Sequence, residues 1–383
     1  MTTHRLSALI CSVMARQGGW LPFDRFMALA LYAPGLGYYA RGNRQFGMLP
    51  SSGSDFVTAP ELSPLFGQAL ARQVAQALDG SGTDEVWEFG AGSGVLAREL
   101  LDTLGARVKR YTIVDVSGAL RERQREVLRL HLDRVRWIDE WPETLQGVVV
   151  GNEVLDAMPV QLLHFDGQHW HERGVALREI GSDAATGAPP WAWADRCTDL
   201  RAPVDDLVSL GVSPGAVFTT EIHAQAEAFI ATLAERLQRG AAFFIDYGFP
   251  AAEYYHPQRS GGTLMCHRAH QADTDPLADV GAKDITAHLN FTGIAMAAQS
   301  AGLQVLGYTS QARFLMNCGL LELLQGADAF TADTASTIAN AQKLLTEHEM
   351  GELFKVIGFA TQCDAAFTTA PIGFTHGDRT HTL

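Results

Sequence analysis

The stretch that decides the fold is VWEFGAGSGVLAREL, residues Val86–Leu100. An apolar run ends at Phe89, three glycines follow at every second position, and a helix-forming segment continues the chain. Glycines at such a strand-to-helix turn let the backbone bend sharply and approach a ligand with no Cβ in the way. The stretch therefore predicts a nucleotide-type ligand beyond the carboxyl end of a parallel strand.

The spacing of Gly90, Gly92 and Gly94 differs from the G-x-G-x-x-G pattern that places a pyrophosphate on a helix N-terminus. Glu88 stands just before these glycines, where its carboxylate repels a pyrophosphate but suits a cation. Asp115 ends the next expected strand, where an acid accepts hydrogen bonds from both ribose hydroxyls. S-adenosylmethionine (SAM) carries a sulfonium and an ammonium and no phosphate, so we predict a SAM site. A turn without a ligand and a nicotinamide or flavin site are the alternatives.

Strand-like and helix-like segments alternate from about residue 84 onward. The expected strands are Glu85–Phe89, Arg110–Val114, Val135–Ile138, Gly147–Val150, Ala241–Ile245, Leu303–Tyr308 and Glu352–Thr361. The expected helices are Val95–Leu104, Ala119–His131, Glu221–Arg239 (ending at Gly240) and Thr286–Ala301. This alternation predicts an α/β fold with a doubly wound, mostly parallel sheet.

The alternation also suggests how the chain is divided. We expect residues 1–80 to form an N-terminal helical cap over the cofactor, residues 81–363 the core, and residues 364–383 a C-terminal tail. Two segments of the core break the alternation. Residues 161–215 carry tryptophans and short alternating runs, which are typical of a β-rich insertion, and residues 250–285 are rich in Gly, Pro and His, which predicts a long active-site loop.

Charge and cysteine usage narrow the class of protein. The 383 residues include 29 basic and 43 acidic ones, a net charge of -14, and 47% are hydrophobic. Proteins that bind nucleic acid or anionic membranes need a basic surface, so neither partner is expected. The five cysteines are scattered without a CxxC pair, as in proteins with reduced thiols, and we expect a cytoplasmic location. No apolar run is long enough for membrane insertion.

Polar residues follow the third and fourth expected strands. The fourth strand ends in GNEVLDAMPV, Gly151–Val160, which puts Asn152 and Glu153 beside the methyl donor, with Asp156 just after them. Asp139 follows the third strand, where its side chain can reach the adenine edge. The alternatives are a loop residue for Asp139 and a helix-capping residue for Asp156.

Two further motifs carry weaker signals. In TAPE, we expect Thr58 to close over the cofactor with Pro60 and Glu61, although Thr58 and Glu61 also have the spacing of a plain capping box. His169 and His171 resemble a metal pair, but no third ligand is apparent, so no metal is expected.

Several stretches together resemble a known family. They are SDFVTAPELSPLFGQALARQ (Ser54–Gln73), EFGAGSGVLA, YTIVDVSGALRERQ (Tyr111–Gln124), GNEVLDAMPV, FFIDYG (Phe243–Gly248) and DPLADVGAKDITAHLNF (Asp275–Phe291). In this order they are similar to the MidA-like family of SAM-dependent methyltransferases. Its eukaryotic members include the mitochondrial protein arginine methyltransferase that assists assembly of respiratory complex I. The similarity runs from about Gly19 to about Ala360.

The resemblance implies a seven-stranded methyltransferase core with an N-terminal segment folded over SAM, and S-adenosyl-L-homocysteine as the product. It also implies a protein substrate, with symmetric dimethylation of arginine on a subunit of the respiratory NADH dehydrogenase. The sequence departs from the family pattern in two places. Ser54 precedes Asp55 where glycine is more common, and Asn290 stands where aspartate is usual. If that aspartate holds a cationic acceptor, Asn290 weakens an arginine-specific interpretation.

An arginine acceptor makes carboxylates the expected catalytic groups, because its guanidinium has a pKa above about 12 and must lose a proton. Glu153 and Asp156 are in the right topological place, and Asp246 and Tyr247 end the fifth strand nearby. His288 is a proton acceptor, a substrate contact or a structural residue. Two alternative functions are an assembly or chaperone-like factor that uses SAM structurally and a methyltransferase for small molecules. The oligomeric state stays open.

Overall fold

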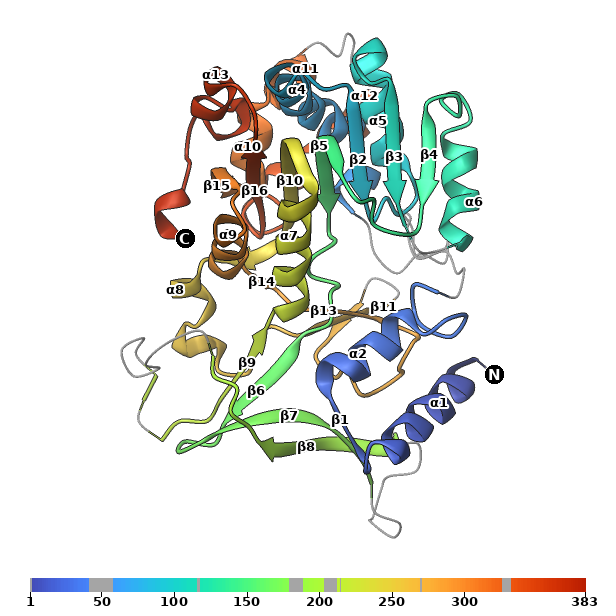
Figure 1. The fold of residues 1–383 in the computed structure, drawn as a ribbon, viewed down its shortest axis with the longest axis vertical. Helices are drawn as coiled ribbons and strands as arrows, with labels where there is room; N and C mark the ends of the chain where they lie inside the picture. Colours follow the sequence, from blue (N-terminus) through green and yellow to red (C-terminus); the bar gives the residue numbers. More distant parts are fainter. Residues whose placement is uncertain are drawn as a thin grey trace.

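The computed structural model describes residues 2–40, 58–115, 118–178, 189–202, 212–213, 215–268, 271–325 and 332–383 of the chain. These residues form an upper lobe, which carries the glycine-rich stretch, and a lower lobe made largely of antiparallel strands (Figure 1). None of the described helices is long and apolar enough to cross a membrane.

The upper lobe is built on one large sheet. Its strands are β2 (Glu85–Phe89), β3 (Arg110–Val114), β4 (Val135–Ile138), β5 (Leu145–Asn152), β10 (Leu237–Phe249), β15 (Gln304–Ser310) and β16 (Phe354–Thr361), with the short β14 (Leu289–Asn290) paired to β10. In the described part of the chain the order is β15–β16–β10–β5–β2–β3–β4. The strands from β10 to β4 run parallel, and β16 is antiparallel to both neighbours. The expected doubly wound, seven-stranded α/β sheet is thereby confirmed.

Helices cover both faces of this sheet, because successive residues of a strand point to opposite sides. Val86 packs in the cluster of one face and Trp87 in the cluster of the other. The first face is covered by α4 (Pro64–Ser81), α5 (Val95–Leu104), α10 (Gln311–Asn317), α11 (Leu320–Gln325), α12 (Ala332–Leu345) and α13 (Ala365–Thr369), and the second by α7 (Ala224–Arg236) and α9 (Phe291–Ser300). The helix α6 (Gly118–Val127) follows β3 beside the edge strand β4 (Figure 1).

The lower lobe contains two smaller sheets. The strands of the first are β1 (Trp20–Pro22), β6 (Gln161–Phe165), β7 (Trp170–Leu177), β8 (Trp191–Cys197) and β9 (Phe218–Ile222), and those of the second are β11 (Met265–Arg268), β12 (Gln271–Asp273) and β13 (Asp284–Thr286). The helices α1 (Thr2–Arg16) and α2 (Phe23–Tyr32) pack on them through a shared core that includes Leu6, Phe26, Trp191 and Ile285. The expected β-rich insertion is therefore present.

The described part of the first eighty residues is divided between the two lobes, whereas the sequence predicted a single cap over the cofactor. Residues 2–40 belong to the lower lobe, because β1 pairs antiparallel with β7 and completes its sheet. The helix α4 instead packs on α5 in the upper lobe. The expected tail also differs, since Phe367 and Phe374 are buried in the core against α4 and α10.

Several element boundaries differ from the sequence-based expectation. The helix α9 begins at Phe291, five residues later than expected, because the Asn290 side chain accepts from the Gly293 N–H and caps it there. The helix α7 ends at Arg236, so Gly240 lies inside β10, where a Cβ would be 1.7 Å from the carbonyl oxygen of Gly147. The segment 250–285 forms α8 (Ala251–Tyr254) and the sheet β12–β11–β13 where a loop was expected, because such short strands leave little periodicity in a sequence.

Candidate functional site

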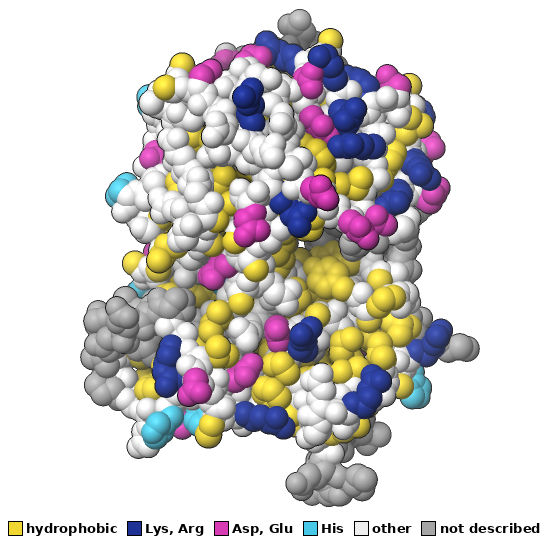
Figure 2. Space-filling model, viewed as in Figure 1, with side chains coloured by type: hydrophobic (Ala, Val, Ile, Leu, Met, Phe, Trp, Pro, Cys, Tyr) yellow, Lys and Arg dark blue, Asp and Glu magenta, His cyan; other side chains and the backbone are white. Residues whose placement is uncertain are grey.

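A cavity of about 770 Å³ lies between the lobes, at the carboxyl ends of β2, β3 and β5. Figure 2 shows a hollow at the waist of the molecule, with hydrophobic side chains exposed inside it. The predicted site residues that line the cavity are Thr58, Glu88, Gly90, Gly92, Asp115, Asp139, Asn152, Glu153 and Asp156. Gly94 and His288 are outside this lining. The topology thus brings nine of the eleven predicted residues to one place.

The glycine turn requires glycine at several positions. Gly90, Gly92 and Gly94 have φ values of 64°, 51° and 85°, in the left-handed region that L-residues rarely adopt. A Cβ on Gly90 would lie 2.9 Å from Cγ2 of Val154, and one on Gly94 would lie 3.3 Å from Cα of Gln124. Gly94 is the N-cap of α5, so it shapes the turn from behind the cavity.

Gln124, on α6, ties the glycine turn to the ribose-binding position. Its Nε2 donates to the Gly92 carbonyl oxygen and to Oδ2 of Asp115, both at 3.0 Å, and its Oε1 accepts from Nε1 of Trp137 at 2.9 Å. The Gln124 side chain is fully buried. Sequence reasoning missed this residue, although it ends the quoted stretch Tyr111–Gln124; the available signal was a glutamine on the apolar face of a charged helix.

We predict that Gln124→Leu weakens S-adenosylhomocysteine binding by about tenfold or more, because it leaves the Asp115 carboxylate, the Gly92 carbonyl and the Trp137 N–H without this partner. Isothermal titration calorimetry measures the affinity. Glu126→Leu, on an exposed position of the same helix, is the matched control and should bind like the wild type. Equal affinity of the Gln124→Leu variant, in a sample with a wild-type circular dichroism spectrum, would refute this role.

The donor side of the cavity suits a cation. Glu88 is buried, accepts from the Tyr111 hydroxyl at 2.7 Å, and has its pKa raised to about 8 by burial, with Asp115 adding to the effect. The Asn152 Nδ2 donates to Oε1 of Glu153 at 2.9 Å, while its Oδ1 is buried without a hydrogen-bond partner. Among the described residues that line the cavity, none is Lys or Arg. The buried Asn152 Oδ1 and the acidic side chains around it fit the ammonium and sulfonium of SAM.

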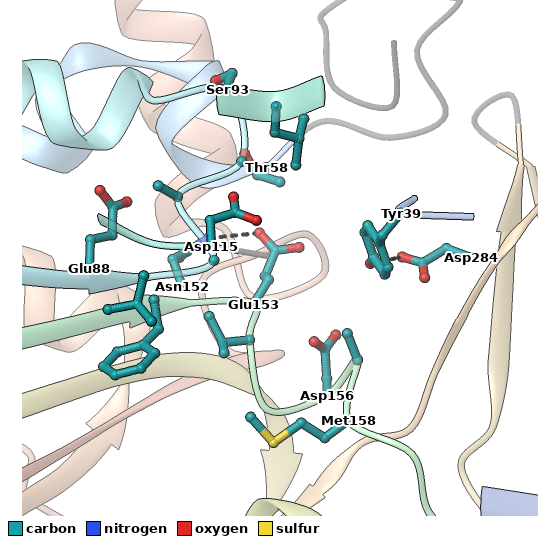
Figure 3. Close-up of a pocket in the computed structure, with 18 of the residues that line it drawn as sticks. Tyr39, Thr58, Glu88, Ser93, Asp115, Asn152, Glu153, Asp156, Met158 and Asp284 are labelled. Carbon is teal, nitrogen blue, oxygen red and sulfur yellow. Dashed lines mark hydrogen bonds between the residues drawn. The ribbon is translucent and has the colours of Figure 1, made fainter. Parts of the chain in front are cut away.

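Further carboxyl groups converge on the acceptor side (Figure 3). Glu153 and Asp156 extend from the end of β5 toward a gap, and across it the Tyr39 hydroxyl donates to Oδ2 of Asp284 at 2.7 Å. Burial raises the pKa of Glu153 to about 8, and the charge of Asp156 adds to the effect. Burial also raises the pKa values of Asp156 and Asp246, and the charge of Asp246 adds to the effect on Asp156.

His288 lies behind the cavity wall. Its ring stacks on Tyr247, which does line the cavity, with the centroids 5.7 Å apart. Burial lowers the pKa of His288 to about 4, so the ring is neutral near pH 7. The structure does not bring this ring to the acceptor. Asp284, from the same D-I-T-A-H block, reaches the cavity in its place, and sequence reasoning overlooked it.

The TAPE segment, residues 58–61, does not form the capping box that its spacing allows. Thr58 is the N-cap of α3 (Ala59–Leu62), but its side chain makes no capping hydrogen bond. The Glu61 carboxylate instead accepts from the hydroxyl of Ser93, in the glycine turn. Glu61 and Ser93 therefore both face the cofactor side of the cavity. Asp55 lies outside the described residues.

No group of three or more His, Cys, Asp or Glu that could hold a metal ion occurs in the described part of the chain. His171 instead contacts Oδ2 of Asp166 through its Nε2, at 2.9 Å.

Comparisons with known proteins agree with this geometry. A family model described as S-adenosyl-L-methionine-dependent methyltransferase matches residues 69–309. The mitochondrial protein arginine methyltransferase NDUFAF7 homolog of Caenorhabditis elegans is 24% identical, over 83% of this chain and 77% of that protein. The human protein arginine methyltransferase NDUFAF7, also mitochondrial, is 25% identical, over 88% and 79%. A crystal structure of a COG1565 superfamily member from Burkholderia thailandensis, bound to S-adenosyl-homocysteine, is 49% identical, with a TM-score of 0.90 over 100% of this chain and 97% of that one.

The comparisons correct the expected cytoplasmic location. The curated relatives are named as mitochondrial proteins, which contradicts an assignment made from the cysteines. Scattered reduced thiols occur in any reducing compartment, so they do not distinguish one such compartment from another.

The cofactor is thereby established together with the fold. The family model spans well over half of the chain, and the structure that is 49% identical holds S-adenosyl-homocysteine. The protein is an enzyme that uses SAM as its methyl donor. The chain belongs to the MidA-like family of SAM-dependent methyltransferases.

Proposed function

We propose that this enzyme transfers methyl groups from SAM to arginine side chains of a protein substrate. The observation that carries the proposal is the set of three carboxyl groups, Glu153, Asp156 and Asp284, around the acceptor end of the cavity. A guanidinium is a planar cation that carboxylates bind through two parallel hydrogen bonds, so an acidic cavity suits it well.

The residues of the cavity would share the chemistry as follows. When bound, SAM supplies a methyl group from its sulfonium, and the remainder of the cofactor is a neutral thioether. Glu153 orients one guanidinium nitrogen and accepts the proton that this nitrogen loses as its bond to the methyl carbon forms. Asp156 and Asp284 line the same end of the cavity and add acidic groups beside it. Glu88 and Asp115 hold the cationic and ribose parts of the donor on the other side of the cavity.

The asparagine at position 290 does not argue against an arginine acceptor. Its side chain caps α9 and its Nδ2 donates to the Tyr255 hydroxyl at 3.3 Å. Asn290 is not among the residues that line the cavity. The departure from the family pattern therefore alters a helix cap and leaves the acidic acceptor site intact.

A subunit of the respiratory NADH dehydrogenase is the acceptor protein that we propose, with symmetric dimethylarginine as the product and a role in assembly of that complex. This finer assignment is supported by the resemblance to family members that act there and by the curated relatives, which are named as protein arginine methyltransferases.

The test is a labelling experiment with the full chain. Methyl-labelled SAM and purified protein are added to a lysate of cells that lack the protein, and labelled peptides are identified by mass spectrometry. We expect label on an arginine of a respiratory-chain subunit, and at least about a hundredfold slower labelling with Glu153→Gln. Label confined to the small-molecule fraction would replace the proposal by a small-molecule methyltransferase. No label, with S-adenosylhomocysteine binding intact, would replace it by an assembly factor that uses SAM structurally.

A further inference from the structure

We propose that Asp246 is a positioning residue, which holds the turn after β5 in the one conformation that directs Glu153 into the cavity. The proposal rests on the proposed function only in giving Glu153 the role of proton acceptor. Its structural part concerns the backbone of residues 153–155 and stands on contacts within this chain.

The backbone of Glu153 is in an unfavourable conformation. Its φ is 53°, and among the described residues only Asp279 and Gln362 share a positive φ without being glycine. The left-handed region is unfavourable for an L-residue, so it persists only where the surroundings impose it. Glu153 also lies next to the predicted methyl-donor position, which is where such strain commonly serves function.

The contacts that impose this conformation come from β10. The last ladder pair of β5 and β10 is Asn152 with Ile245, and the Glu153 N–H still donates to the Ile245 carbonyl oxygen at 2.9 Å. The next two N–H groups, of Val154 and Leu155, both donate to Oδ2 of Asp246, at 3.2 and 2.9 Å. One carboxylate oxygen therefore takes over from the strand ladder and turns the chain away from β10.

Asp246 does this from behind the site. Its side chain is fully buried, and it is not among the residues that line the cavity, so it acts through Glu153 and not on the acceptor. Its charge also raises the pKa of Asp156. Asparagine at this position keeps one oxygen for the two N–H groups but removes the charge that acts on Asp156. Alanine removes both interactions.

This difference gives the experiment two arms. The first is hydrogen exchange, followed by mass spectrometry, in peptides that contain residues 153–155 of the full chain with S-adenosylhomocysteine bound. We expect Asp246→Ala to raise exchange at Val154 and Leu155 by at least about tenfold and Asp246→Asn to keep their protection. The control is Asp364→Ala, which removes a carboxylate that accepts from the Phe367 N–H in α13, far along the chain from the site. This arm needs no methyl acceptor, so its result is independent of the proposed function.

The second arm is methyl transfer to the labelled acceptor protein. We expect kcat to fall by about a hundredfold in Asp246→Ala and by less than about tenfold in Asp246→Asn, with a shifted pH profile in the latter because the charge of Asp246 no longer acts on Asp156. Unchanged exchange and unchanged kcat in Asp246→Ala would overturn the proposal. So would an Asp246→Asn variant that keeps its exchange protection but loses as much kcat as Asp246→Ala, since the carboxyl itself would then be required.

If Asp246→Ala does not fold, the comparison of Asp246→Asn with the wild type alone decides between these roles. A wild-type protein that methylates nothing would refute the proposed function and leave the exchange result standing.

Discussion

Replacing Glu153 by glutamine is expected to lower kcat by a factor of about 10²–10⁴ and to change the affinity for S-adenosylhomocysteine by less than about threefold. Glutamine has nearly the shape of glutamate and keeps an oxygen for the Asn152 Nδ2. It cannot accept a proton, however, and it carries no charge to pair with a guanidinium. The loss should therefore fall on the chemical step, measured as single-turnover methyl transfer, while calorimetry reports cofactor binding.

The control for this substitution is Glu140→Gln, which neutralises an exposed carboxylate outside the cavity lining. It should have wild-type kcat and wild-type affinity. A Glu153→Gln variant with wild-type kcat would assign the proton to another group, and equal losses in kcat and in cofactor affinity would mean that the residue serves binding and not the transfer step.

The role of Glu153 as proton acceptor also predicts how kcat depends on pH. Burial raises the pKa of Glu153 to about 8, so its proton-accepting form becomes more abundant as the pH rises toward 8. We expect kcat of the wild type to increase between about pH 6 and pH 8 and to level off above that range. In Glu153→Gln this ascending limb should be absent from whatever activity is left. A wild-type profile that is flat between pH 6 and pH 8 would contradict the assignment.

The central sheet could be predicted from the sequence because its signals are local. The strand Glu85–Phe89 and the helix Val95–Leu104 have the predicted bounds, since an apolar run and a glycine turn mark both. The lower lobe depends on pairings between distant segments, such as β1 with β7, and no local pattern specifies them. The start of α9 depended on whether Asn290 or an earlier residue would cap it, a choice made by tertiary contacts with Tyr255.

The residues of the site also divide into those that the sequence predicts and those that it does not. Glu88 and Asp115 could be predicted because parallel strands put their carboxyl ends at one edge of the sheet. The roles of Gln124 and Asp246 could not be predicted, because each acts through hydrogen bonds to another element. The sequence analysis named His288 and not Asp284 in the D-I-T-A-H block, but the chain leaves β13 after Thr286 and carries His288 behind Tyr247.

Without SAM, the protein is expected to lose stability as the pH rises from about 6.5 toward 8. Burial raises the pKa values of Glu88, Glu99 and Glu153 from 4.5 to about 8, so between these values the folded state keeps protons that the unfolded state has lost. Each group can then lower the free energy of unfolding by up to about 1.4 kcal/mol per pH unit. Below pH 6.5 two histidines offset part of this trend, because burial lowers the pKa values of His223 and His288 to about 4 and only the unfolded state binds those protons.

Bound SAM should reverse the alkaline part of this dependence. Its positive charges favour the ionised forms of Glu88 and Glu153, so the increase in Tm that saturating SAM produces should grow from pH 6.5 to pH 8. Differential scanning calorimetry with and without SAM measures both trends. Glu88→Gln keeps an acceptor for the Tyr111 hydroxyl and removes one titrating group, so it should flatten the slope without SAM and reduce the gain with it. A Tm that is constant or rising from pH 6.5 to pH 8 without SAM would mean that these carboxyl groups are already ionised in the empty cavity. The ionised carboxylates of the empty cavity would then lower the stability of the fold by an amount that does not depend on pH. In that case Glu88→Gln should stabilise the empty protein throughout that range.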